Sequence, residues 1–207
     1  MTINSRLKGY IEQEILPLYI SFDKAHNTDH VNQVIEQSLA LAAHCDVDID
    51  MVYTIAAYHD TGLCEGREFH HIASGRILAA DSFLRDFFSS EQIETMREAV
   101  EDHRASSKSA PRTIYGRIVA EADRCIDPMT VIRRTVQFSL KHYPELTIEG
   151  HFKRCHDHLI EKYGRDGYLK LWIPQSNNAQ RLAELQTIAD DIPTLRAIFE
   201  TIYAEEQ

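Results

Sequence analysis

Apolar residues recur at helical spacing along almost the whole chain, and this pattern restricts the fold more than any other feature of the sequence. Near the start, one apolar stripe runs from Ile3 to Ile15 and stops near Pro17. No stretch alternates between apolar and polar residues as a half-buried strand does, and no internal repeat is present. The pattern predicts an all-α fold, a helical bundle with additional C-terminal helices.

Several of the expected helices have a recognisable beginning. Thr28 or Asp29 is expected to cap the second helix and Asp50 the third. Ser89 followed by Gln92 is a capping-box pattern that begins the fifth. The other helices are expected at residues 70–84, 113–126, 129–142, 149–163, 178–191 and 194–205.

The third expected helix, residues 51–60, is apolar on nearly every side, which is typical of a buried central helix. It ends in His59 and Asp60, just before Gly62. A His-Asp pair by itself is common, and an isolated buried Asp is more often a helix cap or an ion-pair partner. At the end of an apolar helix, however, two polar side chains are costly to bury unless a ligand compensates for them.

Two more candidate ligands lie on other expected helices. His30 begins the second helix, and Asp123 lies on the sixth. Two imidazoles and two carboxylates form a mixed nitrogen and oxygen site, which suits Mn, Fe, Co, Ni or Zn better than Ca. We therefore expect His30, His59, Asp60 and Asp123 to hold a divalent metal ion.

The order H…HD…D resembles that of the HD-domain superfamily, with His30 in DHVNQV, His59 and Asp60 in AAYHDTG, and Asp123 in AEADR. The resemblance covers about residues 25–127. It implies a helical, metal-binding and mostly phosphohydrolytic protein.

Residues 1–207 are expected to form a single domain of this type, with a helical extension over residues 128–207. A boundary near Pro128 is conceivable, but no flexible linker marks it. The chain departs from better-known branches of the superfamily. TGLCE follows Asp60 where guanosine-tetraphosphate hydrolases continue as HDxxED, and no GYP segment follows His103.

Some HD-domain proteins carry further His ligands for a second metal ion. The resemblance points to His70 or His71, and to His103, for that role. His70 is favoured slightly because it lies four residues before Ser74. The alternative is that these side chains line the pocket or cap a helix. The expected cofactor is one or two divalent ions of Mn, Fe, Co, Ni, Zn or Mg.

Cationic residues gather near these motifs, although the chain carries a net charge of −10. Arg104 and Lys108 lie in a polar loop and are expected to hold a phosphate group through charge-assisted hydrogen bonds. For most of the cluster, which also includes Arg112, Arg117 and Arg124, ion pairs with nearby Glu residues are the favoured interpretation.

Two other groups of residues are weaker candidates. His26 and His30 have the spacing of a zinc-protease motif, but Asn27 follows His26 where that motif has its Glu. His26 is therefore expected to face the substrate, to support a metal ligand from behind, or to be an ordinary loop residue. His151 and Cys155 share one side of a helix, where a solvent-exposed face is expected rather than a structural zinc site.

The expected function is metal-assisted hydrolysis of a phosphomonoester or phosphodiester in a small phosphorylated metabolite or nucleotide. Asp60 is the expected catalytic residue, because it would hold the metal and also steer the attacking water. Two alternatives stay open: a di-iron oxygenase on the same scaffold, and a regulator that binds a metal or a nucleotide without turnover.

The acidic balance argues against general nucleic-acid binding, which requires a basic surface. No run of 18 apolar residues and no apolar signal segment is visible, so no membrane partner is expected. The four Cys lack CxxC spacing and are expected to be reduced thiols in a cytoplasmic protein. The sequence does not fix the oligomeric state, and a homo-oligomer is one option.

Overall fold

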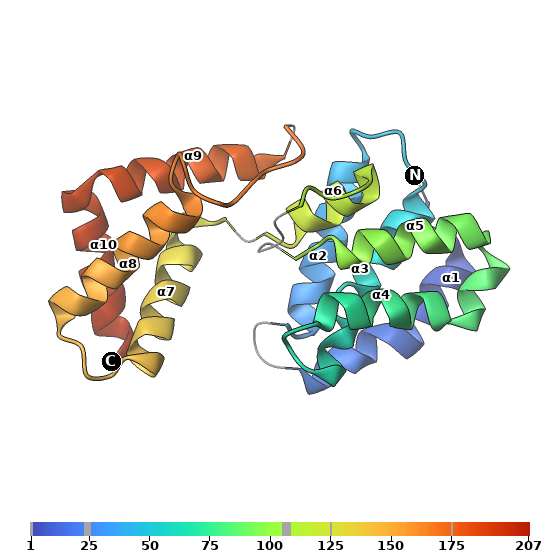
Figure 1. The fold of residues 1–207 in the computed structure, drawn as a ribbon, viewed down its shortest axis with the longest axis horizontal. Helices are drawn as coiled ribbons and strands as arrows, with labels where there is room; N and C mark the ends of the chain where they lie inside the picture. The colour runs from blue at the N-terminus through green and yellow to red at the C-terminus, as the bar shows by residue number, and fades with distance from the viewer. Residues whose placement is uncertain (1, 23–25, 105–108, 125, 175) are drawn as a thin grey trace. The chain divides into compact units, whose positions relative to one another are not determined.

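The computed structural model describes residues 2–22, 26–104, 109–124, 126–174 and 176–207. Within these ranges it contains ten α-helices and no strand, which confirms the all-α prediction. None of the helices described is long and apolar enough to span a bilayer. The chain divides into two compact units, residues 1–124 and 125–207 (Figure 1). The boundary lies close to residue 127, the expected end of the motif-bearing core. The expectation that residues 1–207 act as one domain stays a prediction.

The first unit contains six α-helices and four shorter helical segments. In chain order these are α1 (Ser5–Tyr10), the π-helical η1 (Ile11–Ile15), the 3₁₀ segment η2 (Leu16–Ser21), α2 (Thr28–Ala42), α3 (Ile49–Tyr58), the 3₁₀ segment η3 (Thr61–Glu65), α4 (His70–Ala80), the 3₁₀ segment η4 (Ser82–Asp86), α5 (Ser90–Glu101) and α6 (Ile114–Ala122).

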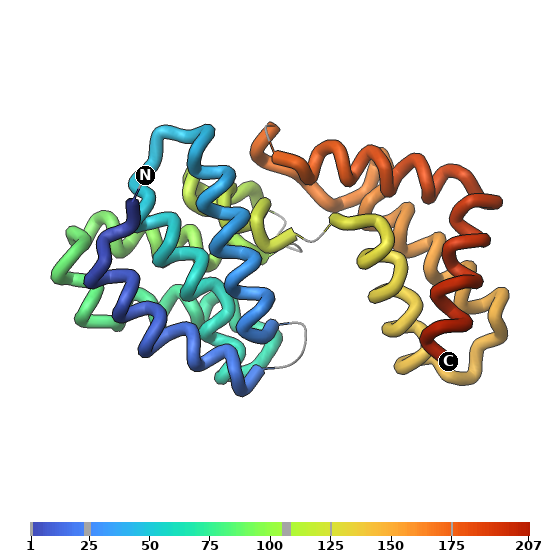
Figure 2. Tube along the Cα trace, turned by 180° about the vertical axis from the view of Figure 1, so that it is seen from behind, coloured from blue at the N-terminus to red at the C-terminus, as the bar shows by residue number. Residues whose placement is uncertain are grey.

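Helix α3 forms the centre of this unit, as the sequence predicted. Every residue from Met51 to Tyr58 is buried. The helix packs against α2, α4, α5, α6 and η1, and α2 and α3 run side by side in Figure 2. Removing this apolar surface from water stabilises the unit. Because α3 is buried up to Tyr58, the polar residues that follow Tyr58 must also lie inside the unit.

The caps of α2 and α3 differ from the sequence prediction. Asn27 caps α2, in place of Thr28 or Asp29, and Asp48 caps α3, in place of Asp50. In both cases the capping residue has an extended backbone, and the residues named from the sequence already lie inside the helix. A side-chain oxygen reaches the free N–H groups of the first turn only from such an extended position. The capping box of Ser89 and Gln92 is confirmed at α5.

The N-terminal stripe does not stop at Pro17. Pro17 lies in the first turn of η2, where a missing N–H is tolerated, and the chain stays helical to Ser21. This extra turn carries Tyr19 into the core, where it is fully buried. The expected helix at residues 70–84 ends earlier than predicted, because Asp81 leaves the helical conformation and caps η4.

The second unit contains four helices: α7 (Pro128–His142), α8 (Ile148–Tyr163), α9 (Asn177–Asp190) and α10 (Ile192–Glu206). They enclose an apolar core of their own. The prediction of a solvent-exposed face at His151 and Cys155 was wrong, because both side chains are buried. The His151 ring contacts the Ser139 hydroxyl, with 2.7 Å between Nδ1 and Oγ. This hydrogen bond explains how a His is accommodated in the core.

Candidate metal centre

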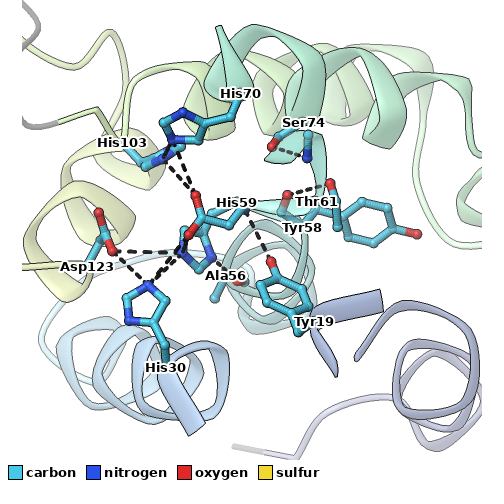
Figure 3. A network of polar contacts seen from close by, with 12 residues as sticks. Tyr19, His30, Ala56, Tyr58, His59, Thr61, His70, Ser74, His103 and Asp123 are labelled. Carbon is cyan, nitrogen blue, oxygen red and sulfur yellow. Dashed lines mark hydrogen bonds and ion pairs between the residues drawn. The ribbon is translucent and has the colours of Figure 1, made fainter. Parts of the chain in front are cut away.

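Six side chains from five parts of the first unit point towards one another (Figure 3). Each lies at the end of a helix or immediately beyond it, where the backbone can turn into the centre of the unit. They are His30, His59, Asp60, His70, His103 and Asp123. The sequence had named all six, but it placed Asp123 within a helix, whereas that residue follows the last turn of α6.

The first group of donors combines His30, His59 and Asp60. The Nε2 atoms of the two imidazoles lie 3.3 Å apart. The Oδ2 atom of Asp60 is 3.2 Å from Nε2 of His59 and 3.6 Å from Nε2 of His30. Asp123 completes the group, with Oδ1 at 3.2 Å from Nε2 of His30. These atoms could coordinate a single metal ion.

The second group combines Asp60, His70 and His103. Here the Nε2 atoms lie 3.1 Å apart. The other carboxylate oxygen of Asp60, Oδ1, is 3.3 Å from Nε2 of His70 and 3.5 Å from Nε2 of His103. Asp60 therefore presents one oxygen to each group, which is the arrangement of a carboxylate that bridges two metal ions.

The hydrogen bonds of three imidazoles prepare them for metal coordination. The Nδ1 atoms of His59, His70 and His103 each face a backbone carbonyl three residues earlier, at 2.8, 2.8 and 2.6 Å. A carbonyl oxygen only accepts, so Nδ1 carries a proton, and in the neutral imidazole the lone pair lies on Nε2. Facing lone pairs repel one another unless a proton or a cation lies between them. The donor set and its tautomers thus fit divalent metal ions.

Electrostatic interactions keep both carboxylates of the centre ionised. Burial raises the pKa of Asp60, but the charge of His59 and the hydrogen bonds from His103 and His59 outweigh it and hold the pKa well below its usual range. Burial likewise raises the pKa of Asp123, while the hydrogen bond from His30 and the charge of His59 lower it. Two negative charges in a buried centre favour a bound cation.

The pKa of His59 responds to the same charges. Burial alone lowers it, but the charge of Asp60, its hydrogen bond and the charge of Asp123 raise it to about 9 in the metal-free centre. A proton on Nε2 of His59 therefore occupies the place that a metal ion would take.

The turn after Asp60 brings the two groups together. The N–H of Gly62 donates to the Ser74 hydroxyl at 2.8 Å, which ties η3 to α4. A Cβ atom on Gly62 would lie 2.2 Å from the carbonyl oxygen of His70 and 2.4 Å from the Ser74 nitrogen. Only glycine permits this approach, so Gly62 does more than end α3, the role expected from the sequence.

Burial of the centre is uneven. His59, Asp60 and His103 are almost completely buried. The side chains of His30, Asp123 and His70 are 18%, 22% and 15% exposed. A small molecule can reach the centre at these three donors, which are accessible to solvent.

The structure distinguishes between the two neighbouring His of α4. His70 belongs to the second group, whereas His71 belongs to neither. The His71 ring lies 5.6 Å from that of His70, between centroids, and its buried Nδ1 lacks a hydrogen-bond partner among the described residues. Burial and the charges of His103 and Arg104 lower the pKa of His71 to about 4.

The structure describes two of the three expected phosphate-binding residues, His26 and Arg104. The His26 ring is 5.8 Å from that of His30, between centroids. Arg104 donates from Nη1 to the carbonyl oxygen of Glu68 at 2.7 Å, and it is close enough to His71 to affect its pKa. Lys108 lies outside the described residues.

Arg112 forms ion pairs with nearby carboxylates, as the favoured interpretation of most of the cationic cluster predicted. It donates from Nε to Asp102 at 3.0 Å and from Nη2 to Glu101 at 2.9 Å, and Nη1 lies 3.3 Å from Glu98. Arg124 is buried, with Nη1 at 3.7 Å from a carboxylate oxygen of Glu121.

Two residues that support the centre were not identified from the sequence. Asn27 accepts a hydrogen bond from the His30 N–H at 3.0 Å and so fixes the first turn of α2. Its position before the helix was the available signal, because Asn is favoured at N-caps. Tyr19 contacts the backbone of Asp60, 41 residues away, and no local pattern indicates such a contact.

The HD domain family model matches residues 28–126 of the chain. The chain contains an HD domain. The matched residues include all six side chains of the centre, and they agree closely with the range expected from the motifs. HD domains are in general metal-dependent hydrolases that bind divalent ions. Comparisons with curated proteins and with solved structures gave no match.

Proposed function

We propose that this HD-domain protein is a phosphohydrolase that uses two divalent metal ions. The observation that carries the proposal is the position of Asp60, whose two carboxylate oxygens face two separate pairs of Nε2 atoms. Paired metal ions held in this way are typical of enzymes that transfer or hydrolyse phosphoryl groups.

In this proposal the three His with fixed tautomers and Asp60 have different roles. When bound, divalent ions would polarise the phosphoryl group of the substrate and activate a water molecule at neutral pH. His59, His70 and His103 direct their lone pairs through fixed tautomers. Asp60 is the catalytic residue, because its ionised carboxylate holds the centre together and can accept a hydrogen bond from the attacking water.

The proposed substrate is a small phosphorylated metabolite or nucleotide. His26, whose ring lies beside that of His30, and Arg104, which lies close to His71, would donate hydrogen bonds to the phosphate. The net charge of −10 favours a small substrate over a nucleic-acid polymer, because a polymer requires a basic surface that neutralises many phosphates.

Metal analysis followed by a substrate screen tests the proposal. Protein purified without chelator should contain two metal equivalents per chain. It should hydrolyse members of a phosphomonoester and phosphodiester panel with Mn, Co, Ni, Zn or Mg. Metal-replete protein that turns over no phosphoester would contradict phosphohydrolysis. Oxygen consumption by the iron-loaded protein would instead support an oxygenase.

The Asp60→Asn variant tests the ligand assignment separately. It removes the charge of the bridging carboxylate while keeping its shape, so both metal ions and activity should be lost together. The far-UV circular dichroism should stay near wild type. Asp46→Asn is the matched control, because Asp46 is exposed and far from the six donors in sequence. Full metal retention in Asp60→Asn would refute the assignment.

A further inference from the structure

Tyr19 connects the N-terminal segment to the candidate metal centre. It lies on η2, before residue 28, where the match to the HD domain begins. Its side chain is completely buried, and its ring centroid lies 6.2 Å from that of His59. Figure 3 shows its hydroxyl pointing towards the end of α3.

The Tyr19 hydroxyl makes two hydrogen bonds at the point where the backbone ladder of α3 ends. It donates to the carbonyl oxygen of Ala57 at 2.9 Å and accepts from the N–H of Asp60 at 3.1 Å. The C-terminal end of a helix leaves carbonyl groups without intrahelical partners, and the Asp60 N–H lies where α3 has given way to η3. Buried backbone groups of either kind must find another partner. One hydroxyl thus satisfies two backbone groups beside the ligand pair.

The backbone of Asp60 has left the helical conformation, with φ −112° and ψ 5°. The Tyr19 hydroxyl donates its proton to the Ala57 carbonyl, so an oxygen lone pair remains to accept from the Asp60 N–H.

The direction of the Asp60 carboxylate depends on this backbone geometry. Its Oδ1 and Oδ2 atoms reach separate His pairs only if the residue is held in one orientation, and an error of about 1 Å in such a site is costly for function. The Tyr19 hydroxyl is the contact that links this orientation to a segment outside the family match.

We propose that Tyr19 is a positioning residue of the metal centre, whose hydroxyl fixes the Asp60 backbone so that the carboxylate can bridge two ions. The inference rests on the proposed function in one respect, since it takes the six side chains to be metal ligands. The functional centre would then include a residue of η2, which precedes the first residue of the family match.

The Tyr19→Phe variant tests the inference, because it removes only the oxygen atom. We expect metal binding to weaken about tenfold to hundredfold, as is usual when a partner of a ligand is removed. The visible absorption spectrum of the cobalt-loaded variant should also change, since the geometry around the ions is altered. Tyr53→Phe is the matched control. Tyr53 is a buried tyrosine of α3, and among the described residues no hydrogen bond joins it to the centre.

The readouts separate positioning from a structural role. A variant that loses thermal stability but keeps the wild-type cobalt spectrum and metal affinity would overturn the inference. If the variant does not fold, amide hydrogen exchange of the wild-type protein decides. The Asp60 amide should be strongly protected, and fast exchange would overturn the inference. Neither readout requires a substrate, so the inference survives if phosphoester turnover fails.

Discussion

Metal binding by this protein should depend steeply on pH, because a proton competes for the His59 nitrogen. The pKa of His59 in the metal-free centre is raised to about 9. At pH 7 only about one molecule in a hundred has a free Nε2 lone pair on His59. Binding of an ion to the first group must therefore displace about one proton.

The apparent dissociation constant should consequently fall about tenfold for each pH unit between pH 7 and pH 8.5. Calorimetric titration with Mn²⁺ or Co²⁺ in two buffers of different ionisation enthalpy measures the protons released, and we expect about one per ion in the first group. A dissociation constant that is unchanged over this range, with no proton release, would refute the reasoning.

The raised pKa of His59 also predicts how the thermal stability of the chelated protein depends on pH. The pKa of His59 is higher in the folded protein than its ordinary value of 6.5, so protonation stabilises the fold. This contribution is fully present below about pH 6.5 and is lost as the pH rises through about 9. Thermal denaturation of the chelated protein should show this loss, while the metal-loaded protein should be much less affected.

Two further substitutions should act on the second group of donors. Gly62→Ala should lower the melting temperature by several degrees and reduce binding of one ion, because its Cβ would collide with the His70 carbonyl. Thermal denaturation and metal titration measure both effects. Gly9→Ala is the control, because a Cβ at Gly9 would meet open space. His103→Ala should lose one of two metal equivalents, whereas His71→Ala should keep both, as elemental analysis can establish. Equal metal contents in these two His variants would contradict the arrangement.

The central helix and the polar pair at its end could be predicted from the sequence because burial is costly for polar groups. A helix that is apolar on every side must lie in a core, and His59 and Asp60 at its end then require partners. The positions of His30 and Asp123 on two other expected helices identified candidate partners. None of these inferences required a long-range distance.

The choice between His70 and His71 could not be made securely in this way. Both residues follow a turn whose path is set by the close approach of Gly62 to the backbone of α4. Such an approach depends on atoms that are near in space but not in sequence. The burial of His151 was missed for a similar reason, since its partner Ser139 lies on another helix.

The backbone carbonyls behind His59, His70 and His103 have a consequence for the choice of metal. A carboxylate in that position would make an imidazole more basic, whereas a neutral carbonyl polarises the ring less. Ligands of this kind orient an ion without holding it with the greatest strength, so we expect ions to exchange readily. The metal that the protein carries would then follow the supply in its surroundings, and a single purified sample would report growth conditions as much as intrinsic preference.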